Sequence, residues 1–180
     1  DAGYAVTATG LTAGEIAATP PHPQLTTVTL DVTDDAQVAA CIAGLESLDL
    51  LVNCAGMILR EGKEFTLEGF QQVVDVNLTG TMRMCMAAKS LLEASGGAIV
   101  NCSSIQAHVT IAGSGHYPAT KHAVEGYSES LDHELRTRGI RVSVVEPAFT
   151  RTAFDANVVE PVQETVLCGC IHGERRCDAV

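Results

Sequence analysis

The alternation of short apolar runs with longer stretches of helical periodicity is the feature that most constrains the fold of this chain. The runs have the length and the Val, Ile, Leu and Thr content of strands, and they occupy residues 4–8, 25–31, 48–54, 98–103 and 140–146. The run at 48–54 is typical of a strand that is covered on both faces. Because strands that alternate with helices are joined by crossovers, we predict an α/β fold: a doubly wound, largely parallel sheet with helices on both faces.

Three stretches between these runs carry helical periodicity. The first begins at Asp34, which together with Gln37 resembles a capping arrangement. The second covers residues 66 to about 92 with a break near 77–80, and the third covers 117–138 and is stopped by Gly139. The residues expected to face inward are Val38, Ile42 and Leu45, then Phe70, Val73 and Val74, then Val124, Leu131 and Leu135. No linker divides the chain, so residues 1–180 are expected to form one domain, with no clear strand in 161–180.

Charge and composition exclude several classes of function. The formal net charge is −11 and only 4% of the residues are aromatic, which disfavours nucleic-acid binding. No apolar run reaches the roughly 20 residues that span a bilayer, and no secretory leader is recognisable, so a cytoplasmic protein without membrane contact is expected. Cys168, Cys170, His172 and Cys177 form a group whose spacing matches no common zinc pattern. A reduced, frayed tail is therefore favoured there over a metal site, and no metal is predicted.

The residue types that carry chemistry follow the apolar runs. Ligands of doubly wound sheets bind beyond the carboxyl ends of the strands, and Ser104 follows the run at 98–103. Tyr117 and Lys121 stand four residues apart, so on a helix both side chains point to one face. A neighbouring ammonium favours the phenolate and lowers the pKa of a tyrosine, which makes it a usable acid and base. An aromatic residue and a solvated lysine on an ordinary helix surface would give the same pair.

Several short segments, taken in order, resemble the short-chain dehydrogenase/reductase family. They are L-D-V-T-D (30–34), N-C-A-G (53–56), V-N-L-T-G (76–80), G-G-A-I-V-N-C-S-S (96–104), Y-P-A-T-K (117–121), G-I-R-V-S-V-V-E-P (139–147) and T-R-T (150–152). The resemblance implies a Rossmann-like fold and an NAD(P)-dependent oxidoreductase that interconverts a secondary alcohol and a ketone by hydride transfer. Its partners would be a small alcohol or carbonyl substrate and, as in many relatives, a second copy of the chain in a homodimer or homotetramer.

The resemblance also assigns roles to individual residues. Tyr117 would be the general acid and base, and Ser104 would bind the substrate oxygen. Lys121 would lower the pKa of Tyr117 and hold the nicotinamide ribose, while Asn77 would kink its helix and support a relay water behind the lysine. The further positions that match the cofactor-binding pattern are Asp31 and Val32 for the adenine ring, Asn53, Ala55 and Gly56 for the floor of the site, and Pro147 with Thr152. Of the last two, Thr152 would contact the carboxamide or the pyrophosphate.

Departures from the family pattern leave alternatives open. The family's glycine-rich phosphate turn is missing before residue 1, and the C-terminal end is also short, so we expect a chain that is incomplete at both ends. An inactive fragment, or a non-catalytic binding module on the same scaffold, is the alternative to the oxidoreductase. A sugar-nucleotide epimerase or dehydratase would share the Tyr and Lys, but it usually needs a longer chain.

Details of the cofactor and substrate sites also depart from the pattern. Gly10 stands where an Asp would favour NAD, which favours NADP slightly, and Ala148 replaces a usual Gly. The substrate site is expected between residues 105–115 and an apolar segment from Phe154 onward. His108 and His116 flank this site, where either could contact the substrate, but both are more easily explained as surface histidines.

Overall fold

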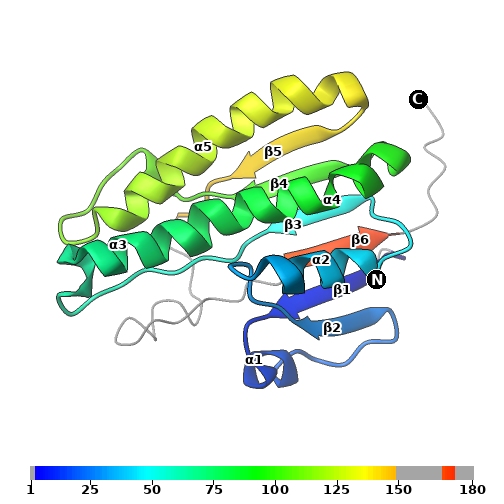
Figure 1. The fold of residues 1–180 in the computed structure, drawn as a ribbon, viewed down its shortest axis with the longest axis horizontal. Helices are drawn as coiled ribbons and strands as arrows, with labels where there is room; N and C mark the ends of the chain where they lie inside the picture. The colour runs from blue at the N-terminus through cyan, green and yellow to red at the C-terminus, as the bar shows by residue number, and fades with distance from the viewer. Residues whose placement is uncertain (1–2, 149–167, 173–180) are drawn as a thin grey trace.

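A six-stranded sheet forms the centre of the molecule (Figure 1). The computed structural model describes residues 3–148 and, for their backbone alone, residues 168–172. The strands are β1 (Ala5–Gly10), β2 (Leu25–Thr29), β3 (Leu50–Asn53), β4 (Ala98–Cys102), β5 (Arg141–Val145) and β6 (Cys168–His172), and they lie in the order β2-β1-β6-β3-β4-β5. Five of them correspond to the five runs predicted from the sequence.

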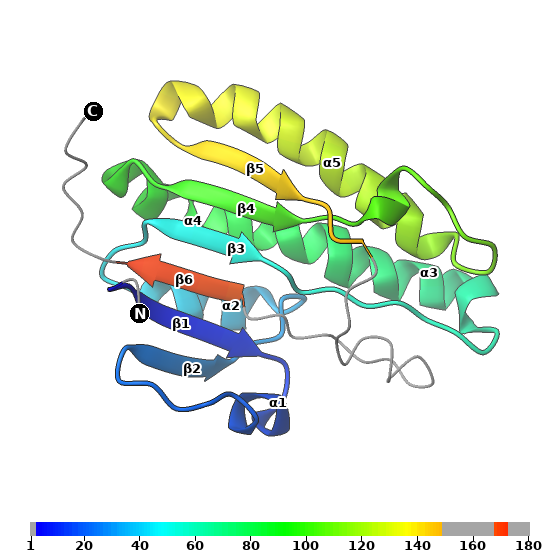
Figure 2. The same cartoon turned by 180° about the vertical axis from the view of Figure 1, so that it is seen from behind.

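Strand β6 is the element that the sequence analysis missed. It pairs antiparallel with β1 on one side and with β3 on the other, whereas the β1–β2, β3–β4 and β4–β5 pairs are all parallel. The arrow of β6 accordingly points against those of its neighbours in Figure 2. The expectation that 161–180 holds no strand is therefore wrong for residues 168–172, and the sheet is largely rather than wholly parallel. The side chains of Cys168, Cys170 and His172, and Cys177 as a whole, lie outside the described residues.

The crossovers determine which face of the sheet the helices cover. The helices are α1 (Ala13–Ala17), α2 (Asp35–Ala43), α3 (Leu67–Val74), α4 (Thr81–Ser95) and α5 (His116–Leu135). The chain moves in one direction across the sheet from β2 to β3, β4 and β5, and right-handed crossovers in one direction place their helices on one face. Figures 1 and 2 show α2, α3, α4 and α5 together on that face, with short α1 beside β2 at the edge. Among the described helices, the second face is therefore covered far less than the sequence predicted.

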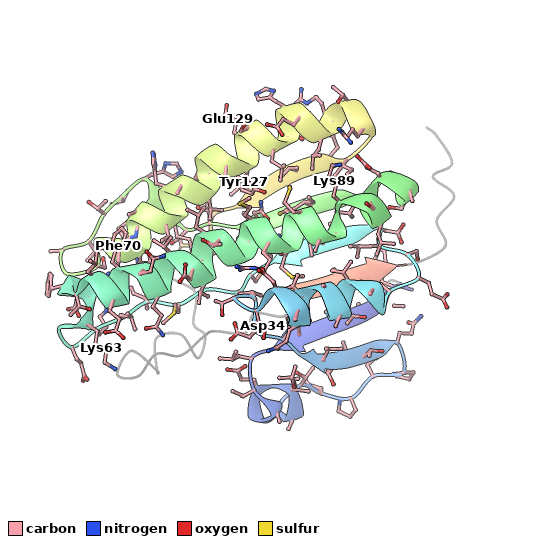
Figure 3. The ribbon with its side chains drawn as sticks, viewed as in Figure 1. Asp34, Lys63, Phe70, Lys89, Tyr127 and Glu129 are labelled. Atoms are coloured by element: carbon pink, nitrogen blue, oxygen red, sulfur yellow. The ribbon has the colours of Figure 1, made fainter. Side chains whose placement is uncertain are left out.

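Local signals set the ends of these helices. The Asp34 carboxylate accepts hydrogen bonds from the backbone N–H groups of Ala36 and Gln37 at 2.8 and 3.0 Å, and it begins α2 as predicted (Figure 3). The bond from the Gln37 backbone, above all, lowers the pKa of Asp34. After α5, Gly139 takes the left-handed conformation at φ +81°, which is the predicted stop.

The apolar core lies between the helices and the covered face of the sheet. Leu51 of β3 and Ile99 of β4 are fully buried there. The predicted inward residues Val38, Ile42, Val73, Val124, Leu131 and Leu135 are all buried, whereas Phe70 is 41% exposed on α3 (Figure 3). The prediction for Phe70 is wrong because Gly69 and Val73, four residues apart, form the buried side of α3. None of the described helices combines the length and apolar character needed to cross a bilayer.

Candidate active site

The segments that follow β3, β4 and β5 meet at one edge of the sheet. The Ser103 N–H donates to the Val145 carbonyl at 2.8 Å, and the Ile105 N–H donates to the Pro147 carbonyl at 3.0 Å. These bonds continue the pairing of β4 with β5 beyond the end of the strands. They hold the segment after β4 in place, and that segment contains one of the predicted catalytic residues, Ser104.

Asn77 joins the segment after β3 to helix α5. It lies in a π-helical turn, Asp75–Gly80, between α3 and α4, where the sequence predicted a break. Its side-chain oxygen accepts from the Met57 N–H at 2.7 Å, and its amide nitrogen donates to the Met57 carbonyl at 3.0 Å and to Thr120 Oγ1 at 3.1 Å. The side chain is 1% exposed. One buried amide therefore holds the backbone of Met57 next to the turn of α5 that carries Lys121.

Tyr117 and Lys121 are both buried in the first turns of α5. The ammonium of Lys121 lies 5.6 Å from the centre of the Tyr117 ring and donates to the Cys102 carbonyl at 2.7 Å. Burial lowers the pKa of Lys121, and the nearby Cys102 and Cys54 thiols and the Glu125 carboxyl partly oppose that shift. The ordinary solvated lysine of the alternative interpretation is excluded, since Lys121 is 4% exposed.

Ser104 lies two residues after the end of β4 and caps a short 3-10 turn, Ile105–Ala107. Its hydroxyl oxygen accepts from the Gln106 N–H at 3.2 Å, and the residue is 8% exposed. The preceding Ser103 donates from its own hydroxyl to the Lys121 carbonyl at 3.2 Å, which ties this segment to α5. The structure therefore places the three predicted residues Ser104, Tyr117 and Lys121 on two segments that are bonded to each other.

The N-C-A-G segment divides into two parts with different surroundings. The Asn53 amide donates to Asn101 Oδ1 at 2.9 Å and to Cys85 Sγ at 3.3 Å, inside the covered face of the sheet. Ala55 packs against the core, and Gly56 is buried. A Cβ atom on Gly56 would lie 3.6 Å from both Asn77 Oδ1 and Lys121 Nζ. Gly56 therefore brings the backbone close to these two polar groups.

The remaining predicted cofactor contacts lie after β2 and β5. Asp31 Oδ1 accepts from the N–H and the hydroxyl of Thr33, at 2.8 and 2.7 Å. Val32 is buried with its side chain next to Gly80, and its carbonyl accepts from Arg83. Pro147 is fixed by the bond from Ile105 described above, and Thr152, like Phe154, lies outside the described residues.

The two histidines near the site differ in their surroundings. His108 is exposed and pairs with Glu146 at 3.1 Å, as expected of a surface residue. His116 is 2% exposed, and its Nε2 accepts from the Leu59 N–H at 3.0 Å, so the surface interpretation is wrong for this residue. Burial, with the positive charge of Arg60, lowers the pKa of His116, while Glu64 opposes that shift. The sequence did place His116 next to a predicted site residue, because it directly precedes Tyr117. It could not show that His116 is buried, because the backbone group that it binds lies 57 residues away, at Leu59.

Comparison of the sequence with known proteins finds relatives of one kind. The sequence model described as short chain dehydrogenase matches residues 2–163. The chain is 38% identical over 128 residues to D-threitol dehydrogenase of Mycolicibacterium smegmatis, covering 68% of this chain and 49% of the relative. It is 37% identical over 147 residues to 3-alpha-(or 20-beta)-hydroxysteroid dehydrogenase of Mycobacterium tuberculosis, covering 78% of this chain and 56% of the relative. The chain thus spans about half the length of the curated relatives it matches.

A solved structure shows the same fold. A short chain dehydrogenase from Burkholderia cenocepacia, crystallised in complex with NADP, matches with a TM-score of 0.75 and 28% identity. The match covers 85% of this chain and 65% of that protein. The fold of this chain is therefore one that this solved dehydrogenase shares.

Proposed function

Because the chain belongs to the short-chain dehydrogenase family, we propose that it catalyses NAD(P)-dependent interconversion of a secondary alcohol and a ketone. One observation carries the proposal: the Lys121 ammonium lies over the ring of Tyr117 while bonded to the end of β4. A buried cation at that place favours the phenolate form of the tyrosine. Tyr117 is thereby suited to give a proton to an oxygen atom and to take it back.

The described residues fit the nicotinamide and adenine ends of such a cofactor. Gly56 leaves space beside the Lys121 ammonium and the Asn77 amide, because a Cβ there would lie 3.6 Å from both. Lys121 would hold the nicotinamide ribose, and the segment of Asp31 and Val32 after β2 would contact the adenine. A bound nicotinamide supplies or accepts the hydride, and the protein orients it.

The chain's own residues would transfer the proton and bind the substrate oxygen. In the reducing direction, the Tyr117 hydroxyl transfers its proton to the carbonyl oxygen, and the resulting phenolate is stabilised by the Lys121 ammonium. In the oxidising direction, the phenolate takes the proton from the alcohol. The Ser104 hydroxyl donates a hydrogen bond to the same oxygen and stabilises the negative charge that develops there. Asn77 keeps the Lys121 turn of α5 in position through Thr120.

Cofactor choice and assembly concern residues away from Tyr117 and Lys121. Gly10 ends β1 without a carboxylate that would bind the ribose hydroxyls of NAD, and this supports NADP as the preferred cofactor. Met82 and Met86 lie four residues apart on α4 and are 49% and 41% exposed. This exposed pair supports a homodimer or homotetramer in which α4 contacts a second copy.

Replacing Tyr117 by Phe tests the proposal directly. The 180-residue chain is assayed with NADPH and NADH and a panel of ketones, following the loss of reduced-nicotinamide absorbance. General acid catalysis contributes roughly 10²–10⁴-fold, so Tyr117→Phe should lower turnover by about that factor while cofactor fluorescence titration still reports binding. Tyr127→Phe, ten residues further along the same helix, is the matched control.

Two outcomes would contradict this proposal. If Tyr117→Phe retained full turnover, Tyr117 would not be the acid and base. If the chain bound cofactor without reducing any ketone of the panel, the non-catalytic binding module would be the better description.

A further inference from the structure

Two cysteines lie side by side at the edge of the sheet that holds the candidate active site. Cys102 ends β4, and Cys54 directly follows β3. The last aligned pair of these parallel strands is Asn53 with Asn101. Extending this register by one residue places Cys54 opposite Cys102. Successive side chains alternate between the two faces of a sheet. Since the side chains of Asn53 and Asn101 are buried under α4, the two thiols belong to the opposite, less covered face, and both are partly exposed.

The spacing of the two cysteines suits a disulfide. Neighbouring strands lie about 4.8 Å apart, and the Cα atoms of disulfide-linked cysteines are usually about 4.4–6.8 Å apart. Their Cβ atoms, at about the strand spacing, are slightly further apart than the roughly 3.5–4.5 Å typical of a disulfide. Closing the bond would therefore draw the ends of β3 and β4 together by a few tenths of an ångström.

The Lys121 ammonium provides the electrostatic setting that activates thiols. It donates to the Cys102 carbonyl at 2.7 Å, and both thiols influence its pKa. The Cβ position of Gly56 lies 3.6 Å from Lys121 Nζ and 3.9 Å from the Cys54 carbonyl, so the segment of Cys54 also adjoins the ammonium. A nearby cation favours the thiolate, which is the reactive form of cysteine.

The other cysteines with described side chains lack this setting. Cys85 is fully buried on α4, and burial raises its pKa to about 12. Cys41 lies on α2, and burial raises its pKa as well. A raised pKa leaves less thiolate at neutral pH, so both thiols are expected to react slowly.

We propose that Cys54 and Cys102 form an oxidation-sensitive dithiol that closes the cofactor site when it is oxidised. The oxidant is a peroxide: one thiolate attacks a peroxide oxygen, giving a sulfenic acid and, from hydrogen peroxide, water. The second thiolate then attacks the sulfenic sulfur, the S–S bond forms and a second water leaves. In total, two thiols and one hydrogen peroxide give one disulfide and two waters.

Formation of the bond alters the place where the cofactor is proposed to bind. The disulfide fastens the segment of Cys54 to the strand end whose carbonyl binds Lys121, and it moves both segments toward each other. The cofactor is thereby excluded, and a thiol reductant reverses the change. This effect on cofactor binding rests on the proposed function, whereas formation of the disulfide does not.

The cross-link can be mapped without any activity assay. In the 180-residue chain carrying Cys41→Ser, trypsin releases Cys54 as the sole cysteine of peptide 1–60 and Cys102 as the sole cysteine of peptide 90–121. After treatment with hydrogen peroxide, mass spectrometry should find these two peptides joined, with the loss of two hydrogens. The joined species should disappear with dithiothreitol and be absent from Cys54→Ser and Cys102→Ser versions of the same protein. If the two peptides are not joined under conditions that oxidise other thiols of the chain, the proposal is overturned.

A second measurement connects the cross-link to the site. NADPH and NADH titrations are followed by fluorescence before and after peroxide, each variant being normalised to its own untreated binding. The Cys41→Ser protein should lose binding and regain it with dithiothreitol, whereas the additional Cys54→Ser or Cys102→Ser change should prevent the loss. Equal loss in the serine variants would overturn the link to cofactor binding. If even the untreated protein binds no cofactor, the proposed function fails, and the peptide map still decides whether the dithiol exists.

Discussion

Replacing Asn77 by Ala removes the amide that joins the segment after β3 to α5. The side chain makes three hydrogen bonds, two to the backbone of Met57 and one to the hydroxyl of Thr120. Thr120 keeps its own bond to the Tyr117 carbonyl at 2.8 Å. Met57 is 1% exposed, and among the described residues its N–H and carbonyl have no other hydrogen-bond partner, so both groups would be left buried and unsatisfied.

The loss of stability in Asn77→Ala can be calculated from the two backbone groups of Met57 that lose their hydrogen-bond partner. An unsatisfied buried donor or acceptor costs about 1–3 kcal/mol, so the pair costs about 2–6 kcal/mol. Water that enters the vacated space offsets part of this cost. We therefore expect the free energy of unfolding to fall by about 3 kcal/mol. For a chain of this size, that corresponds to a decrease in Tm of roughly 6–12 °C.

Thermal and urea unfolding, followed by circular dichroism, measure this loss. Gln71→Ala is a matched control, because Gln71 is an exposed amide on α3 that donates to the carboxylate of Asp75 one turn further along. Its removal should change the free energy of unfolding by no more than about 0.5 kcal/mol. Melting of the Asn77→Ala and Gln71→Ala proteins within about 1 °C of each other would refute this role of Asn77.

Two further predictions concern buried positions near the site. The pKa of His116 is lower in the folded protein than in the unfolded chain, so the unfolded chain takes up the proton first as the pH falls below about 6.5. This residue therefore lowers the free energy of unfolding at acidic pH and has no such effect above that pH. Urea unfolding at pH 7 and pH 5 should show that the free energy of unfolding falls less on acidification in His116→Gln than in the unchanged protein. Equal decreases in the two proteins would contradict the lowered pKa of His116. Gly80→Ala should destabilise the fold by about 1–3 kcal/mol, because its Cβ would lie 2.7 Å from Cγ2 of the buried, stiff side chain of Val32. Gly126→Ala, an exposed position in α5 with nothing within 4 Å, is the control and should be neutral or stabilising, so a Gly80→Ala protein as stable as this control would refute the clash.

The parallel strands and the longer helices were predictable because each carries its own signal. The run at 98–103 corresponds to β4 (Ala98–Cys102), and the buried positions Val124, Leu131 and Leu135 repeat at helical spacing along α5. Helix α1 was missed because it has only five residues, although its capping box, Thr12 with Glu15, is visible in the sequence. Phe70 was misplaced because a glycine, Gly69, occupies the buried side of its helix, and periodicity counts only apolar side chains.

The candidate site was predictable as a set of residues but not as a set of contacts. Tyr117 and Lys121 lie on one helix, so their proximity follows from their spacing alone. The bond from Lys121 to the Cys102 carbonyl depends on how α5 lies against β4, and the bonds from Asn77 to Met57 and Thr120 depend on three separate segments. No local pattern encodes such distances. The chemical roles of these residues therefore remain predictions until the variants are assayed.

Strand β6 shows the limit of local reasoning most clearly. Residues 168–172 contain two cysteines, a glycine and a histidine, a composition with weak strand propensity. They nevertheless form a strand with a neighbour on each side, because β6 pairs with β1 and with β3. Both neighbours lie more than 110 residues earlier in the sequence. Among the described strands, β1 and β3 are joined only through β6. The edges of β1 and β3 that face each other carry backbone N–H and C=O groups that need hydrogen-bond partners, and pairing with them outweighs the low strand propensity of residues 168–172. These two edges exist only once the remainder of the sheet has formed.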